Sequence, residues 1–303
     1  MRPLPLFLLP LLVACVSCGD AGRAQGERVQ VVDDLGRDVQ IETPIRRVVT
    51  LAPSVTEVVF AAGAGDRVVG VSTADNFPPE VRSLPQFSTY PVDFEAIVGL
   101  GPDLVLASDQ VNHPQQITAL ERLGIPSYFL SARELDDVPD LVRRVGHLLG
   151  TDDVAERAAD SLEQGMEQLA AVTSATDERP VVLVLAGSDP LYAFGSESYV
   201  HDLVELAGGV SATGDVGTST PVLSDEFVLR AKPDVIVGTD SITFTPDGLL
   251  ELHPTWDVVP AVANGRVYAI DPDLIYRPGP RLLDGARVLA GMIRPSESTA
   301  ASR

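Results

Sequence analysis

The chain has 303 residues, 45% of them hydrophobic, which is enough for one large core or two cores of roughly 100 to 150 residues each. Its 43 Asp and Glu residues outnumber the 22 Lys and Arg residues, giving a formal net charge of −21 at pH 7. Because such a surface repels phosphate polymers, the composition argues against nucleic acid as a partner.

The first predicted element is an export signal. Arg2 precedes an apolar run over 4–13 that contains two prolines and is too short to cross a bilayer, so residues 1–14 are predicted to be a signal peptide. The tetrapeptide ending at Cys15 (LVAC) resembles the bacterial lipobox, in which the cysteine thiol receives a lipid. Cys15 is therefore the expected lipidated residue and Cys18 the alternative, while an ordinary cleaved signal peptide is the remaining interpretation.

Both cysteines lie in this leading segment, so residues 19–303 contain no thiol. The folded body therefore has no disulfide, no thiolate nucleophile and no cysteine metal site. Residues 15–27 are predicted to be the lipidated cysteine and a flexible tether, and residues 295–303 a disordered tail.

Short β-branched runs alternate with helical stretches along the rest of the chain, after an opening hairpin over 29–41. Strands are predicted at 48–51, 67–71, 103–107, 127–130, 181–185, 235–237 and 267–270. Helices are predicted at 54–62, 93–99, 114–123, 134–149, 199–206, 224–231 and 279–293. This alternation is typical of parallel α/β sheets.

The middle of the chain has a different character. Residues 151–174 are rich in Ala, Glu, Gln and Leu and contain no proline, which predicts one helix of over 20 residues. The expected fold is α/β, with two Rossmann-like lobes over 28–150 and 175–294 that have mainly parallel sheets. The long helix joins the lobes.

The two halves share a local signature. Segments 94–106 and 225–237 each place a glutamate, Glu95 or Glu226, seven residues before a Pro-Asp pair that leads into an apolar strand. This pattern predicts a helix with an acid in its first turn, a proline stop and a buried parallel strand.

Together these features resemble the ABC-transporter periplasmic solute-binding proteins for vitamin B12, haem and ferric siderophores, whose lobes are joined by one long helix. The likeness covers residues 28–294 and is closest to the cobalamin-binding members. It implies a ligand cleft between the lobes and a long helix that resists large hinge motion. Besides the two Glu-to-Pro-Asp segments, it rests on 34–37 (DLGR), 47–57 (RVVTLAPSVTE), Trp256, 261–262 (AV), 264–268 (NGRVY) and 277–284 (RPGPRLLD).

The resemblance implies roles for particular residues. Glu95 and Glu226 match the glutamates that pair with arginines of the two permease subunits, which would orient the protein on a two-fold symmetric partner. Asp273 and Arg277 match polar residues that face the corrinoid, and Tyr90 falls where an aromatic ring contacts it. An ordinary half-buried loop tyrosine and a simple helix-terminus acid are the alternatives for Tyr90 and the glutamates.

The sequence also departs from the cobalamin-binding pattern. Positions that are aromatic there correspond to Ala74, Ser108, Ala186 and Thr220. Other rings that could substitute for them are Tyr192, Phe194, Phe244 and Tyr276, although each is equally suited to the core. This weakens the case for a corrinoid against haem or a ferric siderophore.

Two further candidates come from the residues themselves. Ser54 and Glu57 fit a capping box at a helix start, with ligand contact by Ser54 as a secondary role. His113, in a loop after a strand, is the histidine expected to face the cleft. The four histidines are widely separated, so no zinc motif is expected.

The expected function is that of an extracytoplasmic lipoprotein that binds a corrinoid and delivers it to an ABC permease dimer. A ferric siderophore or haem is the alternative ligand. The protein is expected to be a monomer without catalytic residues, cofactor or bound metal. A secreted enzyme and a surface scaffold are the competing classes, but no coupled nucleophile and base occur in the sequence.

Overall fold

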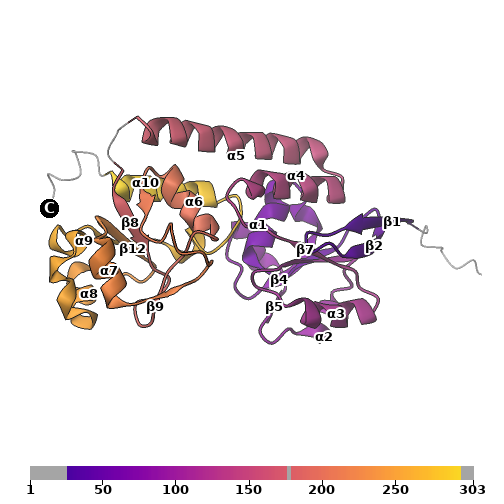
Figure 1. Cartoon of the computed structure of the whole chain (residues 1–303). Helices are drawn as coiled ribbons and strands as arrows, with labels where there is room; N and C mark the ends of the chain where they lie inside the picture. Colours follow the sequence, from indigo (N-terminus) through magenta and orange to yellow (C-terminus); the bar gives the residue numbers. More distant parts are fainter. Residues whose placement is uncertain (1–25, 176–178, 295–303) are drawn as a thin grey trace, which may run out of the picture.

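The computed structural model describes residues 26–175 and 179–294. Within these ranges the chain forms two α/β lobes that lie side by side, and one long helix, α5 (Asp152–Thr173), runs along the top of both in Figure 1. The predicted signal peptide, Cys15, Cys18 and the tail from 295 lie outside the described residues. Among the described helices, none has the length and apolar character needed to cross a bilayer.

The first lobe contains a five-stranded parallel sheet in the order β5-β4-β3-β6-β7. Its strands are β3 (Val48–Thr50), β4 (Val68–Ser72), β5 (Gln86–Phe87), β6 (Leu104–Ser108) and β7 (Ser127–Leu130). Alternate residues of β3 and β6 point to opposite faces, so Val48 and Leu104 join one hydrophobic cluster and Val49 and Val105 another. Burial of both faces explains why these strands are apolar throughout.

An antiparallel hairpin precedes this sheet, formed by β1 (Glu27–Val32) and β2 (Asp38–Thr43). It confirms the predicted opening hairpin. Asp33 shapes the turn, because one carboxylate oxygen accepts hydrogen bonds from the backbone N–H groups of Leu35 and Arg37.

The second lobe contains a four-stranded parallel sheet in the order β10-β8-β12-β13. Its strands are β8 (Val181–Val184), β10 (Val210–Ser211), β12 (Val235–Gly238) and β13 (Val267–Ala269). A separate antiparallel pair is formed by β9 (Leu191–Tyr192) and β11 (Val222–Leu223). As in the first lobe, neighbouring residues of one strand enter separate hydrophobic clusters on the two faces, here Val182 and Leu183 of β8.

Helices cover these sheets. The α-helices other than α5 are α1 (Pro53–Ala61), α2 (Phe94–Gly99), α3 (Pro114–Arg122), α4 (Asp137–Leu149), α6 (Tyr199–Leu206), α7 (Asp225–Ala231), α8 (Pro246–Leu252), α9 (Pro260–Ala263) and α10 (Leu282–Ile293). The 3-10 helices are η1 (Gly65–Arg67), η2 (Pro79–Ser83), η3 (Pro254–Val258) and η4 (Pro272–Leu274). The run from α8 to α9 was not predicted.

Two predicted helix starts are wrong, at 134 and 279, and a third helix lacks its predicted cap. The helix expected from residue 54 begins at Pro53 with Ala52 as N-cap and no side-chain cap, so the capping box is absent and Ser54 lies inside the helix. The helix expected from 134 begins at Asp137, because the Asp137 carboxylate accepts from the N–H groups of Arg133 and Glu134 and closes a turn there. The helix expected from 279 begins at Leu282, after two prolines.

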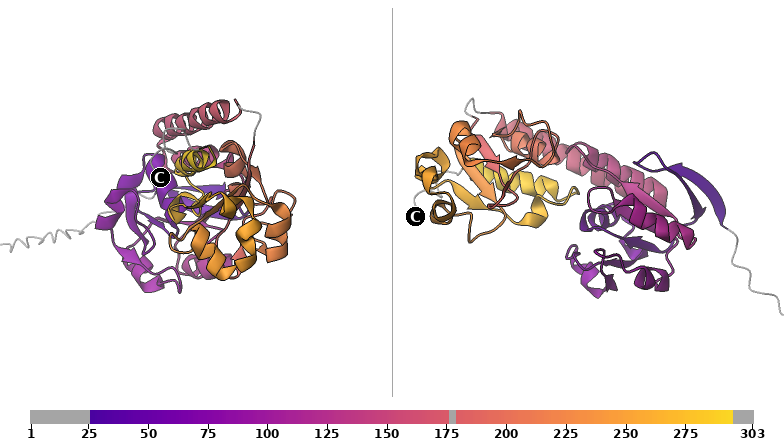
Figure 2. Two further views of the ribbon diagram at one scale, coloured as in Figure 1. Left: turned by 90° about the vertical axis from the view of Figure 1, so that its left-hand side faces the viewer. Right: turned by 60° about the horizontal axis from the view of Figure 1, so that its bottom comes forward.

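The linking helix α5 confirms the prediction to within one residue at each end, and the right-hand view of Figure 2 shows it bridging the purple and orange lobes. It packs on α4 in the first lobe and on α10 and α6 in the second. Both contacts are close, and the contact with α4 requires glycine. A Cβ at Gly146 of α4 would collide with Ala155, and one at Gly165 of α5 would collide with Leu283 of α10. The helix is therefore seated on both lobes.

Candidate functional site

Each parallel sheet has a topological switch point. In the first lobe the chain runs from β3 to β4 and β5 on one side and then crosses to β6 and β7 on the other. In the second lobe β8 is flanked by β10 and β12 in the same way. Open α/β sheets form a crevice outside the carboxyl ends of the strands at such a point. The loops that follow the sheet strands, called here the strand-end loops, are therefore where a ligand is expected.

In the first lobe the switch point is closed by Asn112, which is only 3% exposed. Its Nδ2 donates to the carbonyl of Leu51 after β3 (3.3 Å), and its Oδ1 accepts from the N–H of Ser108 at the end of β6 (3.0 Å). Ser54, in the first turn of α1, and Ser108 line a water-sized cavity here together with Pro278 of the second lobe. The two lobes therefore meet at this switch point.

In the second lobe the corresponding point is closed by Tyr276. Its hydroxyl donates to the carbonyl of Ala186 after β8 (3.1 Å) and lies 3.0 Å from the Thr239 hydroxyl after β12. Its ring packs near that of Phe194, with centroids 5.8 Å apart. Residues 276–278 thus connect the two switch points, because Tyr276 lies at that of the second lobe and Pro278 at that of the first.

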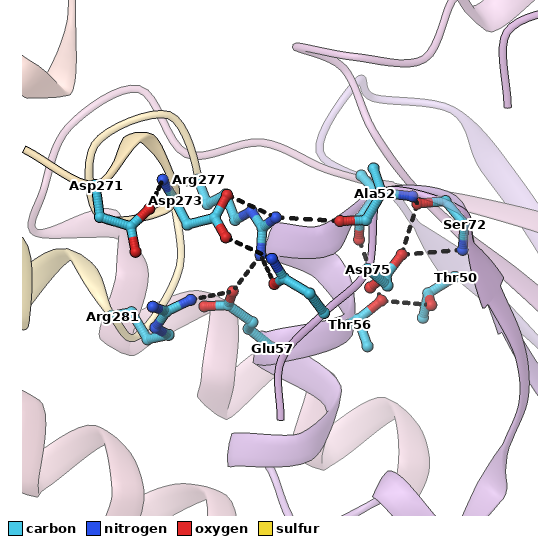
Figure 3. Close-up of polar contacts among 12 residues, drawn as sticks. Thr50, Ala52, Thr56, Glu57, Ser72, Asp75, Asp271, Asp273, Arg277 and Arg281 are labelled. Carbon is cyan, nitrogen blue, oxygen red and sulfur yellow. Dashed lines mark hydrogen bonds and ion pairs between the residues drawn. The ribbon is translucent and has the colours of Figure 1, made fainter. Parts of the chain in front are cut away.

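Arg277, between them, crosses into the first lobe (Figure 3). Its guanidinium donates to Asn76 Oδ1 (2.7 Å) and to the carbonyl of Ala74 (3.1 Å), both in the loop after β4. It also pairs with Asp273 of its own loop (2.7 Å), and Asp273 in turn accepts from Asn76 Nδ2 (2.7 Å). This cluster joins strand-end loops of both lobes.

Glu57 of α1 is the acidic centre of the contact. Its Oε1 is 3.3 Å from Arg277 Nη1 and 3.4 Å from Arg281 Nη1, so two arginines of the second lobe share one carboxylate oxygen of the first. The Arg281 guanidinium also lies 4.5 Å from the centroid of the Phe77 ring. An arginine over an aromatic face is held by the negative potential of the ring as well as by the ion pair.

Burial controls the charge of Glu57. Its side chain is only 1% exposed, and its Oε2 is buried without a hydrogen-bond partner in the described residues. Loss of hydration raises the pKa of Glu57 to about 7, although Arg281 and Arg277 pull it down. Burial likewise raises the pKa of neighbouring Asp75, which accepts from the Ser72 N–H and hydroxyl. Figure 3 shows both carboxylates beside the lobe contact.

Comparison with known proteins identifies the architecture. Residues 48–274 match the sequence profile of the periplasmic binding protein family. The chain belongs to this family. Its members are extracytoplasmic solute carriers and not enzymes. Membership of this family confirms the predicted resemblance and the predicted two-lobe α/β fold.

This periplasmic binding protein has relatives along most of its length. It is 31% identical over 273 residues to an uncharacterized ABC transporter substrate-binding lipoprotein, YvrC, of Bacillus subtilis (strain 168), covering 88% of this chain and 86% of the relative. It is 30% identical over 250 residues to the vitamin B12-binding protein of Pectobacterium carotovorum subsp. carotovorum (strain PC1), covering 82% and 88%. Among solved structures, the periplasmic heme-binding protein RhuT from Roseiflexus sp. RS-1 superposes with a TM-score of 0.74 at 29% identity, covering 82% and 98%.

The predicted ligand residues of this binding protein all lie at or just beyond the carboxyl ends of sheet strands. Asp273 and Arg277 are brought together with the first lobe, and Ser54 lines the small cavity with Pro278. Tyr90, after β5, is 91% exposed. His113, after β6, is exposed, and its Nδ1 is 3.1 Å from Gln115 Oε1.

The two predicted docking glutamates are carried by different lobes. Glu95 is exposed in the first turn of α2, whose N-cap Asp93 accepts from the N–H of Ala96. Glu226 is exposed in the first turn of α7, whose N-cap Ser224 accepts from the N–H of Phe227. Each lobe therefore carries one of the two carboxylates, and both are open to solvent.

Of the four rings suggested as substitutes for missing aromatics, Phe244 is buried at 3% exposure and fills the space above Gly238. Tyr192 and Tyr276 remain partly exposed, at 43% and 38%. Phe194 is partly buried beside Tyr276. In the ranges 26–175 and 179–294, no three His, Cys, Asp or Glu side chains gather as metal ligands would.

The residues that the sequence did not reveal are Glu57, Arg281, Asn76 and Asn112. Glu57 was assigned to a capping box, which would have exposed its carboxylate. The signal in the sequence is Pro53. Proline often takes the first position of a helix, and when Pro53 does so, Glu57 lies one turn inside the helix.

Proposed function

We propose that this protein is the solute-binding component of an ABC importer, and that it binds a corrinoid between its lobes and delivers it to the permease. The observation that carries the proposal is the contact of the two switch points through residues 276–278. Because one short segment reaches both strand-end edges, a molecule bound there contacts both lobes at once.

The surface of the strand-end loops suits a broad, partly apolar ligand. Large hydrophobic side chains on these loops that are at least 38% exposed are Phe77, Tyr90, Val111, Ile242 and Tyr276. A corrin offers flat apolar faces and a rim of amides, which rings and a few polar groups recognise together. The likeness to a vitamin B12-binding protein supports this ligand, and the likeness to a heme-binding protein makes haem the main alternative.

Delivery requires a partner and a location. We propose that Glu95 and Glu226 pair with arginines of the two permease subunits, because exposed like charges on separate lobes suit a two-fold symmetric partner. We further propose that a lipid on Cys15, with Cys18 as the alternative, and the tether over 15–27 hold the protein at the outer side of the membrane. The relative YvrC is named a lipoprotein, which supports the anchor.

Ligand binding is tested by titration calorimetry on the full-length protein in mild detergent, with cyanocobalamin, haemin and ferric siderophores as separate titrants. Tyr90→Ala is expected to weaken corrinoid binding by about tenfold or more, whereas Tyr90→Phe keeps the ring and stays close to wild type. If haemin or a siderophore binds and cyanocobalamin does not, the proposal that the ligand is a corrinoid is wrong. Binding of none of them would favour a surface scaffold.

Docking is tested by uptake into cells. The double substitution of Glu95 and Glu226 by Ala is expected to abolish uptake while leaving the calorimetric affinity unchanged. The matched control replaces Glu167 of α5 and Glu251 of α8, which are equally exposed. Normal uptake with the first pair, or equal loss with the control pair, would eliminate the docking role.

A further inference from the structure

The strand-end loops carry far more acid than base. Counted with the 3-10 helices η2 and η4 that they contain, their acidic residues are Asp75, Glu80, Asp93, Asp109, Glu134, Asp136, Asp189, Asp215, Asp240, Asp271 and Asp273. Their basic residues are Arg82, Arg133, Arg277, Arg281 and the titratable His113. A cleft lined by one sign of charge concentrates molecules of the opposite sign and repels those of its own sign.

The arginines do not offset this excess, because the two that lie at the lobe contact are already engaged. Arg277 and Arg281 share Glu57, and Arg277 also pairs with Asp273. Their side chains are only 11% and 18% exposed, so few of their donors face solvent. Arg82 and Arg133 are exposed, but acidic residues lie close to each in the chain, Glu80 near the first and Glu134 and Asp136 near the second.

We propose that this site accepts neutral or cationic ligands and rejects anionic ones, because its two central arginines are neutralised by Glu57 and Asp273 before any ligand arrives. The inference rests on the proposed binding function and narrows its ligand class. Glu57 and Arg281 act as positioning residues, since they hold Arg277 in the lobe contact and away from an incoming carboxylate.

An anion would meet two penalties here. It would enter a field set mainly by carboxylates. To reach the guanidinium of Arg277 or Arg281 it would have to displace Glu57 or Asp273, which would leave that carboxylate without its partner, at the highest cost for the buried Glu57. Cyanocobalamin is neutral overall and carries amide groups that can donate to carboxylates. Haemin bears two propionates and ferric catecholate siderophores are anionic, whereas hydroxamate siderophores form neutral or cationic ferric complexes.

The test is a calorimetric panel on the full-length protein at pH 8 and low salt. Its members are cyanocobalamin, ferrichrome (neutral), ferrioxamine B (cationic), haemin and ferric enterobactin (both anionic). The proposal expects the tightest binding among the first three, with measurable but at least about tenfold weaker binding of haemin and ferric enterobactin. Tighter binding of haemin or ferric enterobactin would overturn the charge selection while leaving the binding function standing. Binding of no member would overturn both.

A variant tests the cause. Glu57→Gln keeps the shape of the side chain and removes the charge that neutralises Arg277 and Arg281. It is expected to raise the affinity for haemin relative to cyanocobalamin by about tenfold, as expected when one formal charge beside an anion is removed. The matched control, Glu167→Gln on the outer helix α5, is expected to leave this ratio unchanged. An unchanged ratio in Glu57→Gln would overturn the assignment to these arginines.

Discussion

Replacing Glu57 by Gln is expected to remove a large part of the pH dependence of the unfolding free energy. In the folded protein the pKa of Glu57 is raised to about 7, against an ordinary value of 4.5, because burial disfavours the carboxylate. Between these two values the folded state binds more protons than the unfolded state. The stabilisation is therefore fully present below pH 4.5 and is lost as the pH rises through 7.

The magnitude follows from the shift. Each pKa unit corresponds to about 1.4 kcal/mol, so Glu57 accounts for about 3 kcal/mol of unfolding free energy between pH 4.5 and 8. Burial also raises the pKa of Asp34, Asp75 and Asp202, and these carboxyls add to the wild-type slope in the same direction. Only the difference between wild type and variant isolates Glu57.

Urea unfolding at pH 5 and at pH 8, at constant ionic strength, measures this difference. Glu57→Gln should be more stable relative to wild type at pH 8 than at pH 5, by about 2 to 3 kcal/mol. The control is Glu95→Gln, an exposed residue of the same type, which should follow the wild-type profile. Parallel pH profiles for wild type and Glu57→Gln would refute the reasoning.

Three further substitutions test other parts of the frame by chemical unfolding. Arg143→Ala removes the ion pairs of α4 with Glu156, Asp160 and Glu163 of α5. It should lower the unfolding free energy by about 1 kcal/mol at low salt and by less in about 0.5 M salt. An equal loss at both salt concentrations would contradict an electrostatic role. Trp256→Ala empties a fully buried site beside the stacked His253 and should cost about 4 kcal/mol, with Trp256→Phe costing clearly less; equal losses would count against the packing account. Gly150→Ala places a side chain at φ 67° and should cost about 1 kcal/mol, whereas Gly99→Ala, within α2 and with open space around it, should not destabilise.

Elements with strong local signals could be predicted well. The strand over 127–130 and the helix over 199–206 have the predicted bounds, because each is a compact apolar pattern with clear neighbours. The helix over 137–149 ends as predicted, since Gly150 adopts the left-handed conformation that terminates a helix. Starts were less predictable, because a cap, a turn and a proline compete for the same few residues.

The centre of the site could not be predicted from local pattern. Glu57 lies 220 residues from Arg277 and 224 from Arg281 in the chain, so no window of sequence contains the contact. The serine and glutamate of α1 fit a capping box equally well, and only the position of Pro53 and the burial of the helix decide against it. Asp273 and Arg277 were found through the family resemblance, which carries tertiary information that spacing alone lacks.

Because α5 packs on helices of both lobes, it limits how far the two lobes can move apart. A protein built in this way cannot widen its cleft much for a thicker ligand. The lengths and side chains of the loops therefore determine the size of the ligand that it can bind. Exchanging 73–78 and 270–281 for segments from a relative should therefore change what is carried while the frame stays as it is.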